Sequence, residues 1–241
     1  MQDCRLAGWE YRRRARRGRR VAPERQGKAA GGKIEIVTSR SFFVALFAAS
    51  LFLGTASCSN RPPDDPQDYV ARIAAARAAK DADFQRSDDP VPDTKKAEFL
   101  PLAYFPIDPE YNVLAGLKPI TDESKLLMPT STGQQREMRR VGTLEFTLKG
   151  EPMRLTAFIE AGTADMNRLF LPFSDLTSGT ETYAAGRYLD LDRTGSGIYA
   201  LDFNVAYHPY CVYNASYECP YPPPENRLKT PIHAGEKFKQ R

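Results

Sequence analysis

Residues 168–219 read RLFLPFSDLTSGTETYAAGRYLDLDRTGSGIYALDFNVAYHPYCVYNASYEC, and this stretch decides the fold. Three apolar runs, at 168–173, 186–192 and 197–203, are separated by segments rich in Gly, Ser and Thr. The last two runs are joined by a Gly-rich turn at 193–196. Short apolar runs bounded by turn residues, with no helical period between them, predict antiparallel β-strands.

A hairpin is predicted before this stretch. Apolar and polar residues alternate in 139–149 and again in 153–160, with the turn KGEP at 149–152 between them. Upstream, FLPLAYFPI at 99–107 is apolar but interrupted by prolines, which suits an edge strand. The close spacing of these strands predicts a mainly β protein, a small antiparallel β-barrel or sandwich.

Two other segments complete the predicted domain, which we place at 68–241. Residues 68–84 are rich in Ala with interspersed Arg and Lys, follow the cap sequence DDP, and predict one leading helix. Its apolar stripe is narrow, so we expect the helix to lie on the flank of the domain; the stripe consists of Val70, Ile73, Ala74 and Phe84. Residues 207–241 are rich in Pro and Tyr and predict an extended strap around the barrel.

Charge is unevenly distributed along the chain. The formal net charge is +4, but residues 1–40 contain twelve Lys or Arg and four Asp or Glu, so the remainder is mildly acidic. A mildly acidic domain offers no basic face to a polyanion. We therefore expect no nucleic-acid partner.

The first 33 residues form a basic head. Residues 1–33 are dominated by Arg, Gly and Ala and show no apolar period, a composition typical of disorder. A nucleic-acid arm or a membrane-surface patch is the functional alternative. Because a signal segment follows, we interpret the head as a start assigned too far upstream, with Val37 as a candidate first residue.

Residues 34–57 have the layout of a secretory signal. Lys33 and Arg40 supply positive charge, and 42–53 is a twelve-residue apolar run that is too short to span a bilayer as a helix. The small residues GTAS at 54–57 then lead to a cysteine. The segment predicts an exported protein.

Cys58 is the predicted lipidation site. The tetrad TASC resembles the lipobox of bacterial lipoproteins, in which the cysteine is acylated, although Thr55 stands where Leu is usual. Cleavage after Ala56 is the alternative. The polar, Pro-rich tether at 58–67 favours a lipid anchor, so we expect a membrane-anchored protein on the periplasmic or extracellular side. In a cell with two membranes, the absence of Asp after Cys58 resembles signals sorted to the outer membrane.

Several motifs resemble the DUF1684 family of bacterial and archaeal proteins. In order they are KDADF at 80–84, YFPIDPEYNV at 104–113, LFLPFSDLTSGTETYAAGRYLDLD at 169–192, LDFNVAYHPYC at 201–211, CPYPPPENRL at 219–228 and PIHAGEKF at 231–238. The resemblance covers roughly residues 69–238. It implies no activity, because the family is a domain of unknown function. His208 departs from the family's AYNP motif, which has Asn.

The loops and strands of the opening stretch carry the candidate ligand-binding residues. Asp202 and Asn204 alternate with apolar residues, so they share one face of a strand, and Arg187 lies on the neighbouring strand. A fixed guanidinium there would hold a carboxylate or phosphate. An Arg–Asp pair that only closes the barrel is the structural alternative. The candidates are Arg187, Asp202, Asn204, Asp175 and Tyr183.

Cys211 and Cys219 predict a disulfide, because an exported domain with two nearby cysteines commonly forms one. The alternative is a metal site completed by His208 and His233, but the spacing matches no zinc motif. Nucleophilic catalysis lacks a G-x-S-x-G sequence, and Ser178 suits a turn. We expect no cofactor and no metal.

These observations favour an exported, lipid-anchored β-domain that binds a small polar or anionic ligand or a cell-envelope partner. An envelope hydrolase or transferase with its site at the barrel mouth is the first alternative. A purely structural envelope lipoprotein is the second.

Overall fold

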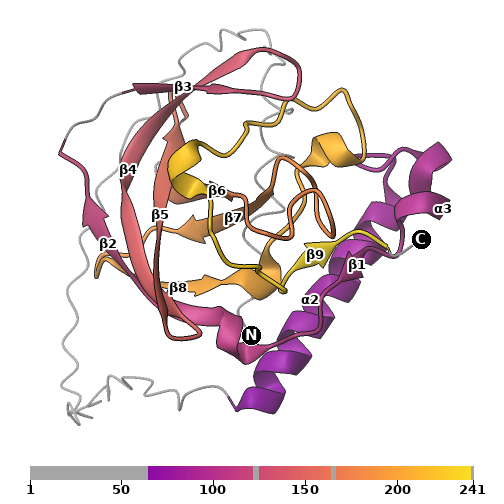
Figure 1. Cartoon of the computed structure of the whole chain (residues 1–241). Coiled ribbons are helices and arrows are strands. Elements are labelled where there is room, and N and C mark those ends of the chain that lie inside the picture. The colour runs from indigo at the N-terminus through magenta and orange to yellow at the C-terminus, as the bar shows by residue number, and fades with distance from the viewer. Residues whose placement is uncertain (1–64, 122–124, 164–166, 240–241) are drawn as a thin grey trace, which may run out of the picture.

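A seven-stranded antiparallel sheet forms a nearly closed barrel (Figure 1). The structure is a computed structural model and describes residues 65–121, 125–163 and 167–239, so the head, the signal segment and Cys58 lie outside the described residues. The strand order is β7-β6-β5-β4-β2-β8, with β3 paired to β4. The strands are β2 (Asn112–Pro119), β3 (Lys125–Pro129), β4 (Gln135–Leu148), β5 (Glu151–Glu160), β6 (Arg168–Phe173), β7 (Arg187–Asp192) and β8 (Ile198–Asp202).

The two edge strands β7 and β8 are brought together by the chain that follows β8. This chain passes through the 3-10 helix η3 (Phe203–Val205) and reaches Tyr207. Tyr188 of β7 donates its N–H to the carbonyl of Tyr207 at 2.9 Å, and Tyr207 returns a bond to Tyr188 at 3.1 Å. The exchange pairs backbone groups that an open edge would expose.

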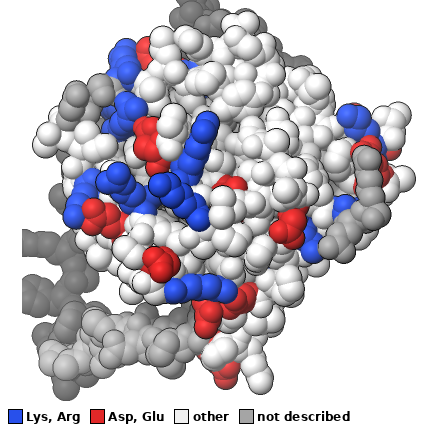
Figure 2. Space-filling view, in the orientation of Figure 1, with Lys and Arg blue, Asp and Glu red and all other residues white. Residues whose placement is uncertain are grey.

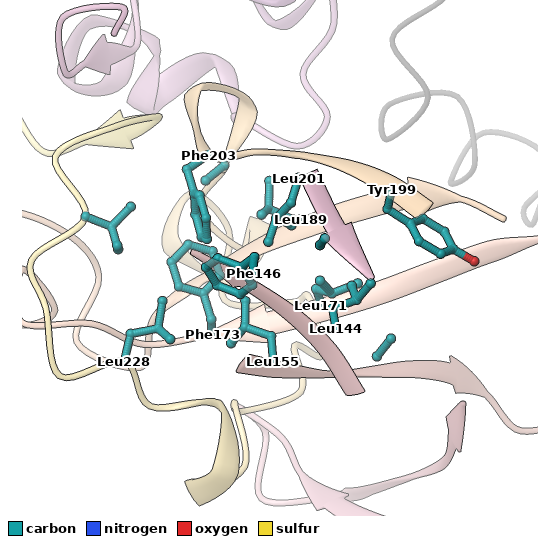
Figure 3. Close-up of a cluster of buried hydrophobic side chains, with 14 of the residues drawn as sticks. Leu144, Phe146, Leu155, Leu171, Phe173, Leu189, Tyr199, Leu201, Phe203 and Leu228 are labelled. Carbon is teal, nitrogen blue, oxygen red and sulfur yellow. The ribbon is translucent and has the colours of Figure 1, made fainter. Parts of the chain in front are cut away.

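The core fills the inside of the barrel with aliphatic and aromatic side chains. Every strand of the seven-stranded sheet except β3 contributes to this core, because inward and outward side chains alternate along a strand. Phe203 contacts Phe146 and Phe173, with ring centroids 5.8 and 5.4 Å apart. Figure 3 shows the cluster, which includes Leu144, Phe146, Leu155, Leu171, Phe173, Leu189, Tyr199, Leu201, Phe203 and Leu228. The predicted mainly β barrel is thus confirmed.

Helix α2 (Pro66–Arg86) lies against one end of the barrel (Figure 1). It begins as expected, because the Asp65 carboxylate accepts the Gln67 N–H at 2.9 Å and Pro66 occupies the first turn. The buried residues are Tyr69, Ile73 and Phe84, whereas Val70 of the predicted stripe is exposed. Among the described residues, no helix has the length and apolarity needed to cross a membrane.

A small second sheet beside α2 pairs an early segment of the domain with its C-terminal segment. It pairs β1 (Ala103–Tyr104) with β9 (Glu236–Lys237), so the Pro-interrupted run at 99–107 does contain a strand in a two-stranded sheet. The remaining short elements are α3 (Lys96–Phe99), η1 (Asp93–Lys95), η2 (Pro109–Tyr111), η4 (Tyr210–Val212) and η5 (Pro224–Asn226).

The C-terminal strap, defined here as residues 207–239, is tied to the barrel by Asn226. Strands β5 and β6 pair at Phe158 and Phe170, and Thr156 would face Pro172 two residues further along. Pro172 has no N–H to donate. The Asn226 amide lies there instead: its Oδ1 accepts the Thr156 N–H at 2.7 Å, and its Nδ2 donates to the carbonyls of Thr156 and Pro172 at 2.9 and 2.8 Å.

The outer face of the barrel carries charges of both signs. Figure 2 shows Lys and Arg interspersed with Asp and Glu on the visible face. Neighbouring strands form the exposed ion pairs Lys118–Glu145 at 2.7 Å and Lys125–Glu137 at 2.8 Å. Such pairs contribute little to stability, about 0–1 kcal/mol each, so this face is a solvated surface.

Candidate functional site

Arg187, the predicted ligand contact, lies inside the domain with none of its surface exposed. Its NH2 group donates to Asp175 Oδ2 at 2.9 Å and to the Ile232 carbonyl at 2.8 Å. Its NH1 group donates to the carbonyls of Ala234 and Glu236. These contacts join β7 and the loop after β6 to the strap. Arg187 therefore has the structural role that the sequence analysis gave as the alternative to ligand binding.

Asp202 and Asn204 lie together, but Asn204 lies in η3 and not in the strand predicted for it, and both residues bond to helix α2 rather than to Arg187. Asn204 Nδ2 donates to Asp202 Oδ1 at 3.2 Å and to Tyr69 Oη at 2.9 Å. The Tyr69 hydroxyl donates to the Asp202 carboxylate at 2.9 Å. Burial raises the pKa of Asp202, although these hydrogen bonds oppose the shift. The cluster holds the start of α2 against the barrel.

Helix α2 is held to the barrel at two further points. Arg77 donates to the carbonyls of Phe105 and Asn204 at 2.9 and 3.1 Å. One turn later, the Asp81 carboxylate accepts the Leu102 N–H at 2.8 Å. The helix is therefore an integral wall of the domain.

A cavity of about 930 Å³ lies between β1, the strap and the loop that precedes β7. Its size falls in the range of small-molecule binding sites. Apolar and aromatic residues form much of its wall, and polar groups reach it from four separate chain segments. The lining residues are Glu98, Phe99, Leu102, Ala103, Thr180, Glu181, Tyr183, His208, Cys211, Val212, Tyr213, Glu236, Lys237, Phe238 and Lys239. Tyr183 is the one predicted ligand contact among them.

Glu236 places a buried carboxylate beside this cavity. Its Oε1 forms an ion pair with Lys80 of α2, and its Oε2 accepts the Tyr213 hydroxyl at 2.9 Å and the His208 N–H at 2.7 Å. Burial alone would raise the pKa of Glu236, but Lys80 and the hydrogen bonds hold it below its ordinary value. Gly235, with φ +77°, sets the position, because a Cβ there would lie 2.5 Å from the Ala206 carbonyl oxygen.

His208 lies beside Glu236 as a neutral imidazole. Burial lowers its pKa to about 4, and the positive charges of Arg187 and Lys80 add to the shift against the attraction of Glu236. Its Nε2 accepts the Tyr183 N–H at 3.3 Å, and its ring stacks on Phe238 at 4.8 Å. An imidazole whose free nitrogen already accepts a backbone N–H is poorly placed to remove a proton from a substrate.

The predicted disulfide is not formed, because no S–S bond joins Cys211 and Cys219. The Cys211 N–H donates to Cys219 Sγ at 3.3 Å, so the Cys219 sulfur faces the backbone of Cys211. Hydrogen bonding from Cys219 is the main cause that lowers the pKa of Cys211 to about 6, and burial opposes it. The Tyr183 hydroxyl contributes a further hydrogen bond.

Neither the alternative metal site nor a catalytic triad is formed by the described residues. Among residues 65–121, 125–163 and 167–239, no three His, Cys, Asp or Glu side chains are grouped to hold a metal ion. His233 lies at the surface, with its Nε2 3.2 Å from Glu181 Oε1. Ser178 serves a turn, where its Oγ accepts the Asp175 N–H at 3.1 Å.

A second, smaller hollow of about 420 Å³ lies on the other side of the 174–187 segment. Asp175 reaches it together with Ser178, Ala184 and Arg227. Neither Arg187 nor Asp202 lines either hollow. The predicted site residues are thus divided between the Arg187 cluster, the Asp202 cluster and the larger cavity.

Sequence reasoning missed Glu236 and Lys80 as partners in this site. Glu236 lies in the quoted segment PIHAGEKF and Lys80 in KDADF, so the motifs of the resemblance included both residues. No periodicity marks either residue. The fold joins them across 156 positions of sequence.

Comparisons with known proteins agree with the fold. The family model described as "Protein of unknown function (DUF1684)" matches residues 97–237. A solution NMR structure of an uncharacterized protein of Haloarcula marismortui is 36% identical, with a TM-score of 0.57, and the match covers 71% of this chain and 95% of that chain. A search of the curated proteins found no match.

Proposed function

The chain belongs to the DUF1684 family, and we propose that its β-domain binds a small ligand in the 930 Å³ cavity while a lipid anchor holds it at a membrane. One observation carries the proposal. The cavity brings together an apolar wall and polar groups from 98–103, 180–183, 208–213 and 236–239. Convergence of a few polar groups in a largely apolar cavity is typical of ligand sites.

The charges around the cavity indicate the chemistry of the ligand. The negative charge of Glu236 is compensated by Lys80, so the buried carboxylate adds no net charge to the cavity. The lining carries both signs, with Lys237 and Lys239 positive and Glu98 and Glu181 negative, and Phe99 and Phe238 contribute aromatic surface. These features favour a small ligand with an apolar or aromatic body and a polar head.

The anchor is the second half of the proposal. Cys58 follows a signal-like apolar run, and α2 begins at Pro66. Eight residues span at most about 30 Å when extended, so an acylated Cys58 would hold the domain close to the bilayer surface. Fatty-acid labelling should mark the wild type and not the Cys58→Ala variant. Labelling that persists in the variant would contradict the anchor.

Ligand binding can be tested with an anionic aromatic dye, 8-anilinonaphthalene-1-sulfonate, and with native mass spectrometry for a co-purified molecule. The Ala103→Trp variant places an indole in the cavity wall. Ala184→Trp, in the smaller hollow, is the matched control. We expect saturable dye binding that Ala103→Trp abolishes and Ala184→Trp preserves. Equal binding by both variants would exclude the cavity as the site.

The two alternative functions have less support. A hydrolase or transferase that used His208 as its general base is disfavoured, because the neutral imidazole is occupied by the Tyr183 N–H. A purely structural lipoprotein would need no cavity of this size. The ligand-binding proposal accounts for both observations.

A further inference from the structure

The two cysteines, which no disulfide joins, occupy unequal positions beside the cavity. Cys211 is half-buried and lines the cavity, whereas Cys219 is 1% exposed and lies behind it. The Cys211 N–H donates to Cys219 Sγ at 3.3 Å, so the sulfur of the inner cysteine lies against the backbone of the outer one. The pair therefore has one thiol that a ligand can reach and one that it cannot.

The inner thiol is fixed by Ser131, in the turn between β3 and β4. The Ser131 N–H donates to the Cys219 carbonyl at 3.0 Å, and the Cys219 N–H donates to Ser131 Oγ at 3.1 Å. Ser131 Oγ in turn donates to the Tyr217 carbonyl at 3.0 Å. Cys219, Ser131 and Tyr183 are all hydrogen-bonded to the Cys211 side chain.

Hydrogen bonds that stabilise a thiolate make a cysteine reactive at neutral pH. The groups that face the Cys211 sulfur are the Tyr183 hydroxyl, Ser131 and the Cys219 thiol, and Tyr183 is itself hydrogen-bonded to Tyr221. These hydrogen bonds lower the pKa of Cys211, and burial opposes them.

We propose that Cys211 and Cys219 form a thiol–disulfide exchange site, with Cys211 as the attacking thiol, Cys219 as the resolving thiol, and a disulfide-containing small molecule or peptide as the substrate. The inference goes beyond ligand binding and rests on the proposed function only because the substrate enters through the same cavity. An accessible, acidic cysteine beside a buried second cysteine is the usual arrangement of such sites.

The reaction balances with the substrate disulfide as oxidant. The Cys211 thiolate attacks one sulfur of R–S–S–R′, which forms a mixed disulfide between Cys211 and R and releases R′S⁻. The Cys219 thiol then loses its proton to solvent or to the released thiolate and attacks Cys211 Sγ. This step forms the Cys211–Cys219 disulfide and releases RS⁻. Two electrons pass from the protein dithiol to the substrate, and the structure represents the reduced form.

The asymmetry of the pair distinguishes this proposal from two inert core thiols. Two structural cysteines would both be buried and would both react slowly with a dissolved disulfide. Cys211 instead contributes to a cavity wall, and its neighbour Tyr183 lines the same cavity. A ligand disulfide in the cavity would therefore meet Cys211 before Cys219.

The test uses the reduced full chain, oxidised glutathione as the probe, and peptide mass mapping, which separates this pair from Cys4 and Cys58. In the wild type we expect the Cys211–Cys219 disulfide to form with release of glutathione. The Cys219→Ser variant should accumulate glutathione on Cys211. The Cys211→Ser variant should react at least tenfold more slowly at Cys219. Equal reaction of Cys219 with and without Cys211, or no modification of Cys211 in Cys219→Ser, would overturn the proposal.

Two further measurements keep the result interpretable. If Cys219→Ser fails to fold, brief alkylation of the wild type with iodoacetamide should label Cys211 before Cys219, and the reverse order would refute the assignment. Dye binding by the wild type is measured in parallel. Dye binding without exchange would refute the exchange site and leave the proposed ligand binding intact. Exchange without dye binding would support the exchange site and contradict the proposed ligand binding.

Discussion

Arg187 is bonded to the strap and Cys211 belongs to it, and the two residues differ in what surrounds them. Arg187 is fully buried, and its NH1 and NH2 groups donate to the Asp175 carboxylate and to strap carbonyls. Cys211 is half-buried and faces a cavity of about 930 Å³. The charged residue Arg187 thus has a structural role. The residue that a ligand can reach is Cys211, which is only weakly polar. Glu236 joins the two, because its carbonyl accepts from Arg187 and its carboxylate lies beside the cavity.

The largest expected effect is the loss of Arg187. Arg187→Ala leaves the Asp175 carboxylate buried without its cation and three strap carbonyls without a donor. Breaking a buried pair in this way costs about 3–5 kcal/mol. Urea unfolding of the wild type and the variant measures the difference.

A surface arginine provides the control for Arg187. Arg140→Ala removes the pair with Glu225 at 3.0 Å, which is partly exposed, so we expect a loss of about 0–1 kcal/mol. Near wild-type stability of Arg187→Ala together with loss of dye binding would instead assign Arg187 to a ligand, as strand alternation alone suggests.

Asn226 is expected to give the next largest effect. Asn226→Leu has a similar volume but removes the amide that bonds Thr156 and Pro172. Each buried backbone group left without a partner costs about 1–3 kcal/mol, and relaxation recovers part of the sum, so we expect a loss of about 3 kcal/mol. Hydrogen exchange at the Thr156 amide should accelerate more than exchange at the other β5 amides, which Asn226 does not bond. An unchanged Thr156 amide would show that another group replaces Asn226.

Much of the fold is predictable from short-range patterns, and the exceptions have physical causes. Apolar and polar residues alternate in the hairpin 139–160, and the strand at 168–173 is largely apolar. Both patterns arise because side chains of these strands are buried in the barrel. Strands β2 and β3 are absent from the predicted elements. Leu114 of β2 is 73% exposed and Leu127 of β3 is 55% exposed, so apolar residues on the solvent side obscure the alternation.

The candidate site is much less predictable than the barrel. Asp202 and Asn204 do bond to each other, but through the turn into η3, where the Asp202 carboxylate accepts the Asn204 N–H at 2.9 Å, and not through strand alternation. Strand alternation does not locate the cavity, because the strap has no repeating pattern and its path depends on individual contacts such as those of Asn226 and Glu236. The disulfide prediction was wrong for a similar reason. The spacing of Cys211 and Cys219 correctly predicts that they lie close together, but it does not determine how the two sulfurs are oriented.

His208 allows the comparison to be tested with pH. Its pKa is about 4 in the folded protein against an ordinary 6.5, so below about pH 6.5 the unfolded chain binds a proton that the folded one does not. The free energy of unfolding therefore decreases as the pH falls below about 6.5, because protonation of His208 favours the unfolded chain. The decrease from this cause ends below about pH 4, where the folded protein binds the proton as well. At pH 5 the loss is about 2 kcal/mol.

The His208→Asn variant, which restores the residue expected from the family motif, should remove this dependence. The Asn carbonyl can still accept the Tyr183 N–H, so stability at pH 7 should change little. Urea unfolding at pH 7, 6 and 5 should show a shallower acid loss than in the wild type. Glu236 titrates below this window in both proteins. Parallel pH profiles would mean that His208 is protonated in the folded state.

The smallest expected effect compares the two thiols directly. Cys211→Ser and Cys219→Ser make the same chemical change eight residues apart, at a half-buried and a 1% exposed position. The Cys211 change faces the cavity, where water can hydrate the new hydroxyl, so we expect a loss below about 0.5 kcal/mol. The Cys219 change buries a hydroxyl and should cost about 1–2 kcal/mol. Thermal melts of the two variants under reducing conditions measure the difference, and equal losses would show that Cys211 is as enclosed as Cys219.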